Sequence, residues 1–176
     1  MDEGHNTIRA VERLRVDATY GKKKHFNAAD RKERYNTRIG LSLIAANVVI
    51  ASNLIYVLVS DIHTIYTAIS LIGFTATLLA IVQAFFNYSR TAEQHRMVAT
   101  KYLHIVKECS RTKAYYQDGA LSADELRERL DNLARKYELI TEDATCLPTN
   151  RKDYEKARKG IEGGEERYSQ GEYQEE

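Results

Sequence analysis

The sequence contains little proline, glycine, cysteine or tryptophan. Its 176 residues include one proline, two cysteines and no tryptophan, and the only glycines between residues 41 and 159 are Gly73 and Gly119. Proline and glycine are the residues that most often end a helix, so their scarcity favours long helices over strands and turns. Two cysteines are too few for a disulfide framework.

Charge is absent from one long stretch of an otherwise highly charged chain. Lys, Arg, Asp and Glu make up 29% of the sequence, yet Asp61 is the only one of them between residues 39 and 89. An uncharged block within a charged chain is typical of a membrane protein. The net charge of +1 lacks the strong basicity that would indicate nucleic-acid binding, and the length argues against a large enzyme with a deep pocket.

The uncharged block divides into two segments that are long enough to cross a bilayer. Arg38 and Asp61 bracket 22 uncharged residues, and Asp61 and Arg90 bracket 28. About 20 helical residues cross a hydrocarbon core roughly 30 Å thick, so we expect transmembrane helices at 39–60 and 63–89, joined as a tight hairpin. The alternative is a soluble bundle with two buried central helices, but core helices of this length normally carry a polar stripe.

Basic residues flank the expected hairpin on one side. Seven lie between Lys22 and Arg38, just before the first span, others follow the second, and the connecting loop has none. The positive-inside rule therefore predicts that both termini are cytoplasmic. We call this set the basic collar: Lys22, Lys23, Lys24, Arg31, Lys32, Arg34, Arg38 and Arg90. Besides setting topology, it is expected to attract anionic lipid headgroups of the bilayer. An anionic-ligand or nucleotide site is less favoured, because no glycine cradle or helix N-terminus is evident, and nucleic acid is the least favoured partner.

The remaining sequence also predicts helices, so the expected fold class is an all-α membrane protein. Nothing interrupts a helix from Phe74 to Asp118, and the second span is expected to continue into the cytosol as one rod that ends at Gly119. Ser122 and Glu125 have the spacing of a capping box, and the helix they begin is expected to fold back along the rod as a cytosolic helical hairpin. The faces expected to meet carry His95, Ala99, Tyr102, Val106 and Cys109 on the rod and Leu126, Leu130, Leu133, Tyr137 and Ile140 on the second helix.

A second apolar face of the rod has two open interpretations. Val98, Leu103 and Ile105 either serve subunit contacts or cover the N-terminal helices. The first of these N-terminal helices is expected at Thr7–Thr19, with Gly21 as the break after it. The second is expected at Asn27–Arg38.

The domain organisation that follows is one module over residues 1–161 and a tail over 162–176. Within the module we expect cytosolic helices in 1–38, and the cytosolic hairpin with a short helix at Asp153–Ile161 in 90–161. Residues 162–176 contain six glutamates and one arginine, which predicts a disordered acidic tail.

Motifs of catalysis and of metal or cofactor binding are absent from the sequence. There is no Gly-rich phosphate loop, no His-Glu-x-x-His and no Cys-x-x-Cys, so we expect neither enzyme activity nor a cofactor. His95 and His104 are nine residues apart, on opposite faces of one helix, and cannot share a metal ion. Cys109, five residues beyond His104, is poorly placed to form a dyad with it. Both cysteines are expected to be reduced on the cytosolic side.

The two expected spans carry small and polar residues without charge. The second has Gly73, Ala76, Ala80, Gln83 and Asn87 at 3-4-3-4 spacing, and the first has Ser42, Ala46 and Asn53 near one face. Such stripes serve helix–helix packing, since small residues let backbones approach and amides hydrogen-bond across the contact. Alternatively, several copies line a pore with them, because two helices alone enclose no channel. Spacing alone favours packing and leaves both interpretations open.

The order of these features resembles the SLATT domain, the SMODS and SLOG-associating two-transmembrane effector domain of bacteria. The resemblance covers roughly residues 8–161 and includes the tight two-span hairpin. The residues that carry it are the basic helix end Arg34-Tyr35-Asn36-Thr37-Arg38, then Ala92, His95, Ala99, Tyr102 and Leu103, and finally Leu147-Pro148 followed by Tyr154 and Ala157.

This resemblance implies a multi-pass effector of antiphage defence in the bacterial inner membrane. Members of the family are thought to form homo-oligomers and pores, so that activation leads to cell death or dormancy. The family's pattern offers no catalytic residues. It implies that the trigger comes from a separate protein, such as a nucleotide-messenger synthase or sensor, from a diffusible ligand, or from a site in this chain that the sequence does not reveal. The alternative is a membrane-anchored helical scaffold or sensor that docks a cytosolic partner without conducting.

Overall fold

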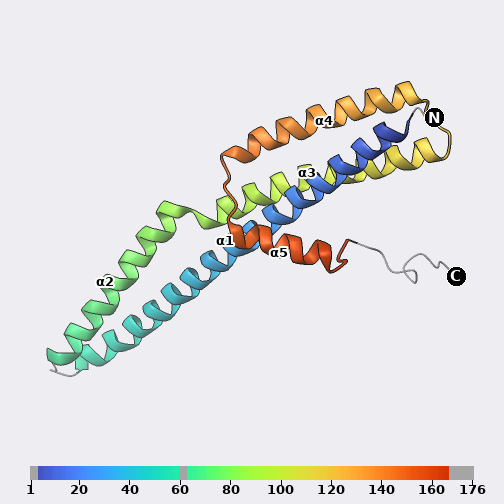
Figure 1. Cartoon of the computed structure of the whole chain (residues 1–176). Coiled ribbons are helices and arrows are strands. Elements are labelled where there is room, and N and C mark those ends of the chain that lie inside the picture. Colours follow the sequence, from blue (N-terminus) through green and yellow to red (C-terminus); the bar gives the residue numbers. More distant parts are fainter. Residues whose placement is uncertain (1–3, 60–62, 167–176) are drawn as a thin grey trace. The chain divides into compact units, whose positions relative to one another are not determined.

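The computed structural model describes residues 4–59 and 63–166, and it describes side chains at 4–52 and 67–166. In these ranges the chain is helical and contains no strand, which confirms the all-α class. The helices, shown in Figure 1, are α1 (His5–Val59), α2 (His63–Phe86), α3 (Tyr88–Gln117), α4 (Ala123–Thr145) and α5 (Arg151–Glu162).

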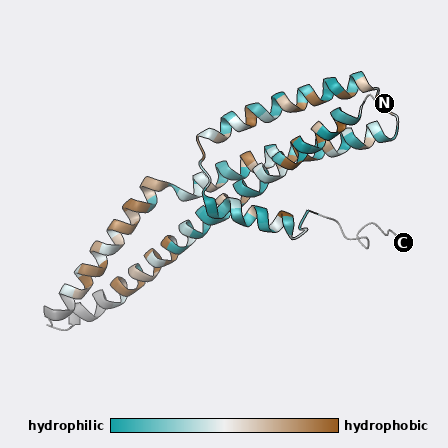
Figure 2. Cartoon of the chain, viewed as in Figure 1, coloured by the Kyte–Doolittle hydropathy of each residue, from teal (hydrophilic) through white to brown (hydrophobic). Residues whose placement is uncertain are grey.

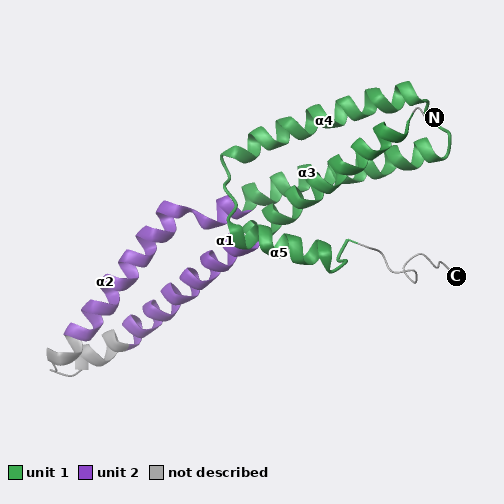
Figure 3. Cartoon of the chain, in the orientation of Figure 1, with its two compact units in different colours: residues 1–29, 93–176 green, residues 30–92 purple. Residues whose placement is uncertain are grey.

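The chain divides into two compact units, coloured separately in Figure 3. We call residues 1–29 and 93–176 the bundle, and residues 30–92 the hairpin. Hydrophobic residues gather along the helices of the hairpin, whereas hydrophilic residues dominate the bundle (Figure 2). Helices α1 and α3 contribute to both units, because each unit boundary falls inside one of them.

The core of the bundle lies between α1, α3 and α4. The five residues predicted for the inner face of α3 are all buried, as are Leu126, Leu133 and Ile140 of α4. Leu130 and Tyr137 are partly buried against the same core. Lys101 pairs with Asp143 and Glu108 with Lys136, so α3 and α4 are antiparallel. The predicted packing of these two faces is confirmed.

The second apolar face of α3 is covered by α1 within the bundle. Val98 and Ile105 lie in one cluster with Val11 and Ala18 of α1, and Leu103 is half-buried. Of the two interpretations left open by the sequence, the structure therefore supports cover by the N-terminal helix.

Helix α1 continues through Gly21, so the predicted break at this glycine is wrong. A Cβ atom added at Gly21 would lie 3.0 Å from three atoms of the Tyr102 ring. The position requires glycine because α1 passes close to α3 there, and not because the chain turns.

The expected uninterrupted rod from Phe74 to Asp118 is also wrong, because Asn87 separates α2 from α3. Asn87 has a φ of +39°, a left-handed conformation that asparagine tolerates better than most residues. Its backbone N–H still donates to the Gln83 carbonyl at 3.1 Å, and its side-chain oxygen accepts the N–H of Arg90 at 3.3 Å. One asparagine thus ends one helix and caps the next.

The helix ends in the bundle follow local sequence signals. Gly119 has a φ of +72°, and the N–H groups of Gly119 and Ala120 bond to the carbonyls of Tyr116 and Tyr115 as in a Schellman motif. The capping box of Ser122 and Glu125 is present as predicted. A second capping box, formed by Asn150 and Asp153, begins α5, which covers the predicted short helix.

One helical stretch in the described part of the chain is long and apolar enough to cross a membrane, judged by length and composition. It is Thr67–Gln117, which the turn at Asn87 divides. The other expected span, 39–60, has described side chains only as far as Ser52. The two-span membrane topology therefore stays a prediction.

Candidate functional site

Part of the predicted polar stripe lies in the contact between α1 and α2 of the hairpin. Ala76 is buried, and a Cβ atom on Gly73 would lie 4.0 Å from the Ile50 side chain. The Gln83 amide donates a hydrogen bond of 3.3 Å to the side-chain oxygen of Asn36. Small residues that allow close approach and an amide pair across the contact are the features of membrane helix packing.

Other residues of the predicted stripes lie away from this contact. Ala80, Asn87 and Ser42 are exposed, and Ala46 is half-buried. Asn53 falls outside the described side chains. The structure thus brings Gly73, Ala76 and Gln83 together with α1 and leaves Ser42, Ala80 and Asn87 exposed. A pore-lining role of either set stays a prediction.

Large apolar side chains cover the outer surface of the hairpin. Phe85, the most exposed of them, is 81% accessible. The exposed set is Leu41, Ile44, Val48, Val49, Leu71, Phe74, Leu78, Ile81, Val82, Phe85 and Phe86. The hydroxyls of Ser52, Thr75 and Thr77 donate to carbonyls of their own helices at 2.8–2.9 Å. A lipid-facing surface needs apolar side chains and polar groups satisfied within the protein, and this surface provides both.

Tyrosine and lysine side chains meet at the Asn87 end of the hairpin. The rings of Tyr35 and Tyr88 are 5.8 Å apart, and the Lys32 ammonium lies 5.4 Å from the centre of the Tyr88 ring. Aromatic rings beside basic residues are typical of the interface between hydrocarbon and water. Sequence spacing alone does not predict this contact, because Lys32 and Tyr35 lie in α1 and Tyr88, more than 50 positions later, begins α3.

The structure divides the basic collar between the two units. Arg31 and Lys32 are half-buried in the hairpin, where Arg34, Arg38 and Arg90 are exposed. Lys22, Lys23 and Lys24 belong to the bundle and are half-buried.

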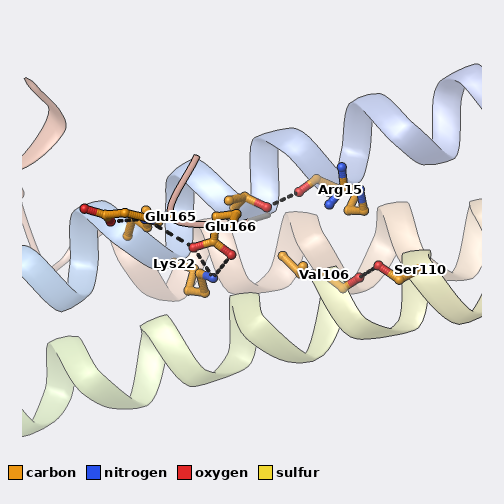
Figure 4. Close-up of polar contacts among 8 residues, drawn as sticks. Arg15, Lys22, Val106, Ser110, Glu165 and Glu166 are labelled. Atoms are coloured by element: carbon orange, nitrogen blue, oxygen red, sulfur yellow. Dashed lines mark hydrogen bonds and ion pairs between the residues drawn. The ribbon is translucent and has the colours of Figure 1, made fainter. Parts of the chain in front are cut away.

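Lys22 and Lys23 bind two carboxylates from the C-terminal part of the same chain, and Figure 4 shows Lys22 beside Glu165 and Glu166. The Lys22 ammonium is 2.8 and 2.7 Å from the two carboxylate oxygens of Glu166. The Lys23 ammonium lies 2.5 Å from Glu165 and 3.3 Å from Glu166. Both lysine side chains are only 12–13% exposed. Charge-assisted contacts of this length are the stronger kind of hydrogen bond.

A Schellman motif at the end of α5 directs these glutamates onto α1. Gly164 has a φ of +86°, its N–H bonds to the Ile161 carbonyl, and the N–H of Glu165 bonds to the Gly160 carbonyl. Gly160 also leaves the space that the Glu165 carboxylate fills, because a Cβ atom there would clash with it. These residues belong to the predicted acidic tail; Glu162 ends α5, and residues 163–166 form the turn that follows it. Residues 167–176 lie outside the described part of the chain.

The ion pairs shift the pKa values of Glu166 and Lys23. Burial alone would raise the pKa of Glu166, but hydrogen bonds and charges from Lys22 and Lys23 outweigh it and lower this pKa. Burial likewise opposes the charged form of Lys23, whereas Glu165 and Glu166 raise its pKa. Both partners are therefore charged at neutral pH.

A buried histidine pair in the bundle was missed by the sequence analysis. The Nδ1 atoms of His25 and His95 are 3.0 Å apart, and each side chain is 1% exposed. Burial, the charge of His95 and that of Lys24 lower the pKa of His25 to about 4, so His25 is neutral at physiological pH. The signal was the spacing of the apolar and small residues Val11, Ala18, Gly21, His25 and Ala28, which places His25 on the inner face of α1.

The other titratable candidates are separated in the structure. His104 is exposed whereas His95 is buried, as expected for opposite faces of one helix. Cys109 is buried, which raises its pKa to about 11, and Cys146 is exposed. Among the residues that the structure describes, no three His, Cys, Asp or Glu side chains are grouped so that they could hold a metal ion.

The chain consists of a charged helical bundle and a hairpin with an apolar outer surface, and α1 and α3 run through both. These features are those of a helical, membrane-associated protein. Within this class, the chain belongs to the SMODS and SLOG-associating 2TM effector domain family 4, whose model matches residues 9–172. The resemblance drawn from the sequence is confirmed. The matched range includes the lysine–glutamate contacts at Lys22 and Lys23. No curated protein and no solved structure matches the chain.

Proposed function

We propose that this effector domain inserts its hairpin into the bacterial inner membrane, oligomerises and permeabilises the membrane when triggered. The expected consequence is cell death or dormancy in antiphage defence. The observation that carries the proposal is the apolar outer surface of the hairpin, on which Phe74 and Phe85 are 62% and 81% exposed. A surface of this kind requires lipid or another protein to cover it.

Oligomerisation follows from the number of helices. One copy contributes two helices to the membrane, and two helices enclose no channel, so a conducting path requires several copies. Within one copy, Gly73, Ala76 and Gln83 are engaged with α1. The path is therefore lined either by the exposed residues Ser42, Ala80 and Asn87, or by the whole stripe after the α1–α2 contact opens.

The proposed orientation places both termini in the cytoplasm. The collar residues Arg34, Arg38 and Arg90 then face the anionic inner leaflet, and the Lys32–Tyr88 contact lies at the level of the headgroups. A separate nucleotide-messenger synthase or sensor would supply the trigger on the same side of the membrane.

Conductance of the reconstituted full chain in planar bilayers tests the proposal. The double variant Gln83→Leu with Asn87→Gly removes both amides and keeps the φ of +39° at the junction; it is expected to reduce conductance strongly while it leaves membrane insertion and oligomer size unchanged. Thr77→Val is the matched control, because its hydroxyl bonds only to the carbonyl of Gly73 in its own helix. Loss of oligomers in the double variant would assign the stripe to packing.

A second candidate function is a membrane-anchored scaffold that docks a cytosolic partner. A charged cleft of about 330 Å³ between α3 and α4 favours it, and Arg111, Arg129 and Lys136 are among its lining residues. The scaffold predicts no change in membrane permeability. It also predicts that charge reversal in this cleft prevents recruitment of the partner to membranes.

A further inference from the structure

A cationic pocket in the bundle has no role in the proposed pore. Lys22 and Lys23 of α1 and Lys156 of α5 supply its positive charge, and Phe26 and Leu103 form apolar walls. Its volume is about 320 Å³, which is large enough for a small charged molecule. All of its lining residues belong to the bundle.

Two of the pocket's lining residues are anionic and contact its lysines. Glu165 and Glu166 approach the two lysine ammonium groups to between 2.5 and 3.3 Å. Two carboxylates on adjacent residues present two negative charges to the ammonium groups of Lys22 and Lys23. A phosphate-bearing ligand with two or more negative charges offers the same pattern, and lysine is a common partner of phosphate.

The resident carboxylates are held by a short segment that begins at two glycines. Gly163 and Gly164 separate Glu165 from α5, and the Glu165 side chain remains 68% exposed although its carboxylate contacts Lys23. Rotation at the glycines can therefore withdraw both glutamates without unfolding α5. An occupant tethered in this way competes with any free anion at a fixed effective concentration.

The lysines require an anion even when the glutamates leave. Lys22 and Lys23 are adjacent in α1, are followed by Lys24, and keep only 12–13% of their side chains exposed. Partly buried like charges without a counterion destabilise a fold, so withdrawal of the glutamates favours uptake of another anion.

We propose that this pocket is a binding site for a phosphate-bearing ligand, and that Glu165 and Glu166 are its built-in competitor. Lys22, Lys23 and Lys156 would bind the phosphate, as a glycine loop or a helix N-terminus does in other phosphate sites. The site is independent of whether the hairpin conducts, because it lies within the bundle. The phosphate can belong to a soluble molecule or to a lipid headgroup.

Calorimetric titration of the full chain with pyrophosphate, in nanodiscs of phosphatidylcholine, tests the site. Replacement of both competitors, Glu165→Gln with Glu166→Gln, is expected to tighten pyrophosphate binding about tenfold. This factor corresponds to glutamates that block the lysines about nine-tenths of the time. Lys22→Gln with Lys23→Gln should abolish binding. The controls are Glu155→Gln and Lys152→Gln, each of which removes one charge of the corresponding sign at an exposed position of α5 outside the pocket.

Equal affinity of the wild type and the glutamate variant, or undiminished binding by the lysine variant, would overturn the proposal. Circular dichroism establishes that each variant is folded. If the double lysine variant does not fold, Lys156→Gln takes its place and should weaken binding at least threefold, an estimate of about 0.7 kcal/mol for one exposed charge.

The same titration in nanodiscs that contain phosphatidylglycerol distinguishes the two sources of phosphate. Weaker pyrophosphate binding by the glutamate variant in these nanodiscs, relative to phosphatidylcholine, assigns the pocket to lipid headgroups. Unchanged binding assigns it to a soluble ligand. Both results support a phosphate site, and neither depends on membrane conductance.

Discussion

At the scale of single residues, the His25–His95 pair makes the stability of the bundle depend on pH. Burial, His95 and Lys24 lower the pKa of His25 from 6.5 to about 4, and the carboxylate of Asp153 acts in the opposite direction. The unfolded chain therefore binds a proton on His25 at a higher pH than the folded chain does. Neutral His25 therefore contributes its full stabilisation of the folded bundle above pH 6.5, and this contribution is lost as the pH falls towards 4.

We expect the bundle to lose up to about 3 kcal/mol between pH 7.5 and pH 4.5 through this histidine. Thermal unfolding of the full chain in detergent, followed by circular dichroism at both pH values, measures the loss. His25→Gln should flatten the pH dependence, whereas His104→Gln, at an exposed position, should preserve it. Equal pH dependence of His25→Gln and the wild type would contradict this assignment.

Gly21 shows how one missing side chain sets the distance between two helices. Because three atoms of the Tyr102 ring already lie 3.0 Å from the place of a Cβ atom, Gly21→Val should destabilise the bundle by about 2 kcal/mol. Gly40→Val is the matched control, since nothing lies within 4 Å of that position. Thermal unfolding of the two variants compares them, and an equal effect would show that the close approach is unimportant.

At the scale of elements, the start of α4 depends on its capping box. The Ser122 hydroxyl accepts the N–H of Glu125 at 3.2 Å, and the Glu125 carboxylate accepts the N–H of Ser122 at 2.8 Å. Ser122→Ala should therefore cost about 1 kcal/mol of stability in thermal unfolding. Ser110→Ala should be near neutral, because its hydroxyl bonds only to the Val106 carbonyl of its own helix (Figure 4).

The junction between α2 and α3 depends on the backbone conformation of Asn87. Asn87→Gly keeps access to its φ of +39°, whereas leucine strongly disfavours it. We expect Asn87→Leu to join the two helices and to slow amide hydrogen exchange at residues 88–90, and Asn87→Gly to leave this exchange fast. Slow exchange in the wild type would show that the junction is an ordinary helical turn.

Two helix ends that adjacent residues define were readable from the sequence, whereas several contacts between distant residues were not. The stop at Gly119 and the start at Ser122 need only their neighbours, and both were predicted. A glycine at position 21 suggested a helix break, but glycine is required there because Tyr102, 81 positions away, lies against it. The ion pairs of Glu166 with Lys22 span 144 positions, and local composition predicted disorder there.

The candidate site in the hairpin was predictable in its residues and not in its geometry. The 3-4-3-4 spacing identified Gly73, Ala76 and Gln83 as members of one stripe. It did not reveal that Asn36 accepts the Gln83 hydrogen bond, because the partner lies on another helix at a register that spacing within α2 does not define.

At the scale of the whole molecule, charge separates the chain into parts suited to different solvents. The 51 residues from 39 to 89 contain one charge, and the rest of the chain contains 50. The proposed function is a consequence of this separation: the hairpin enters hydrocarbon, and the bundle remains in water, where its ligand pocket is accessible.

The membrane potential of cells that express the full chain tests the central claim most directly. At an expression level that arrests growth, a potential-sensitive dye should report depolarisation before growth stops. The Gln83→Leu, Asn87→Gly double variant should keep the potential at equal protein level in the membrane. Growth arrest with an intact membrane potential would contradict the claim that this effector acts by permeabilising the membrane.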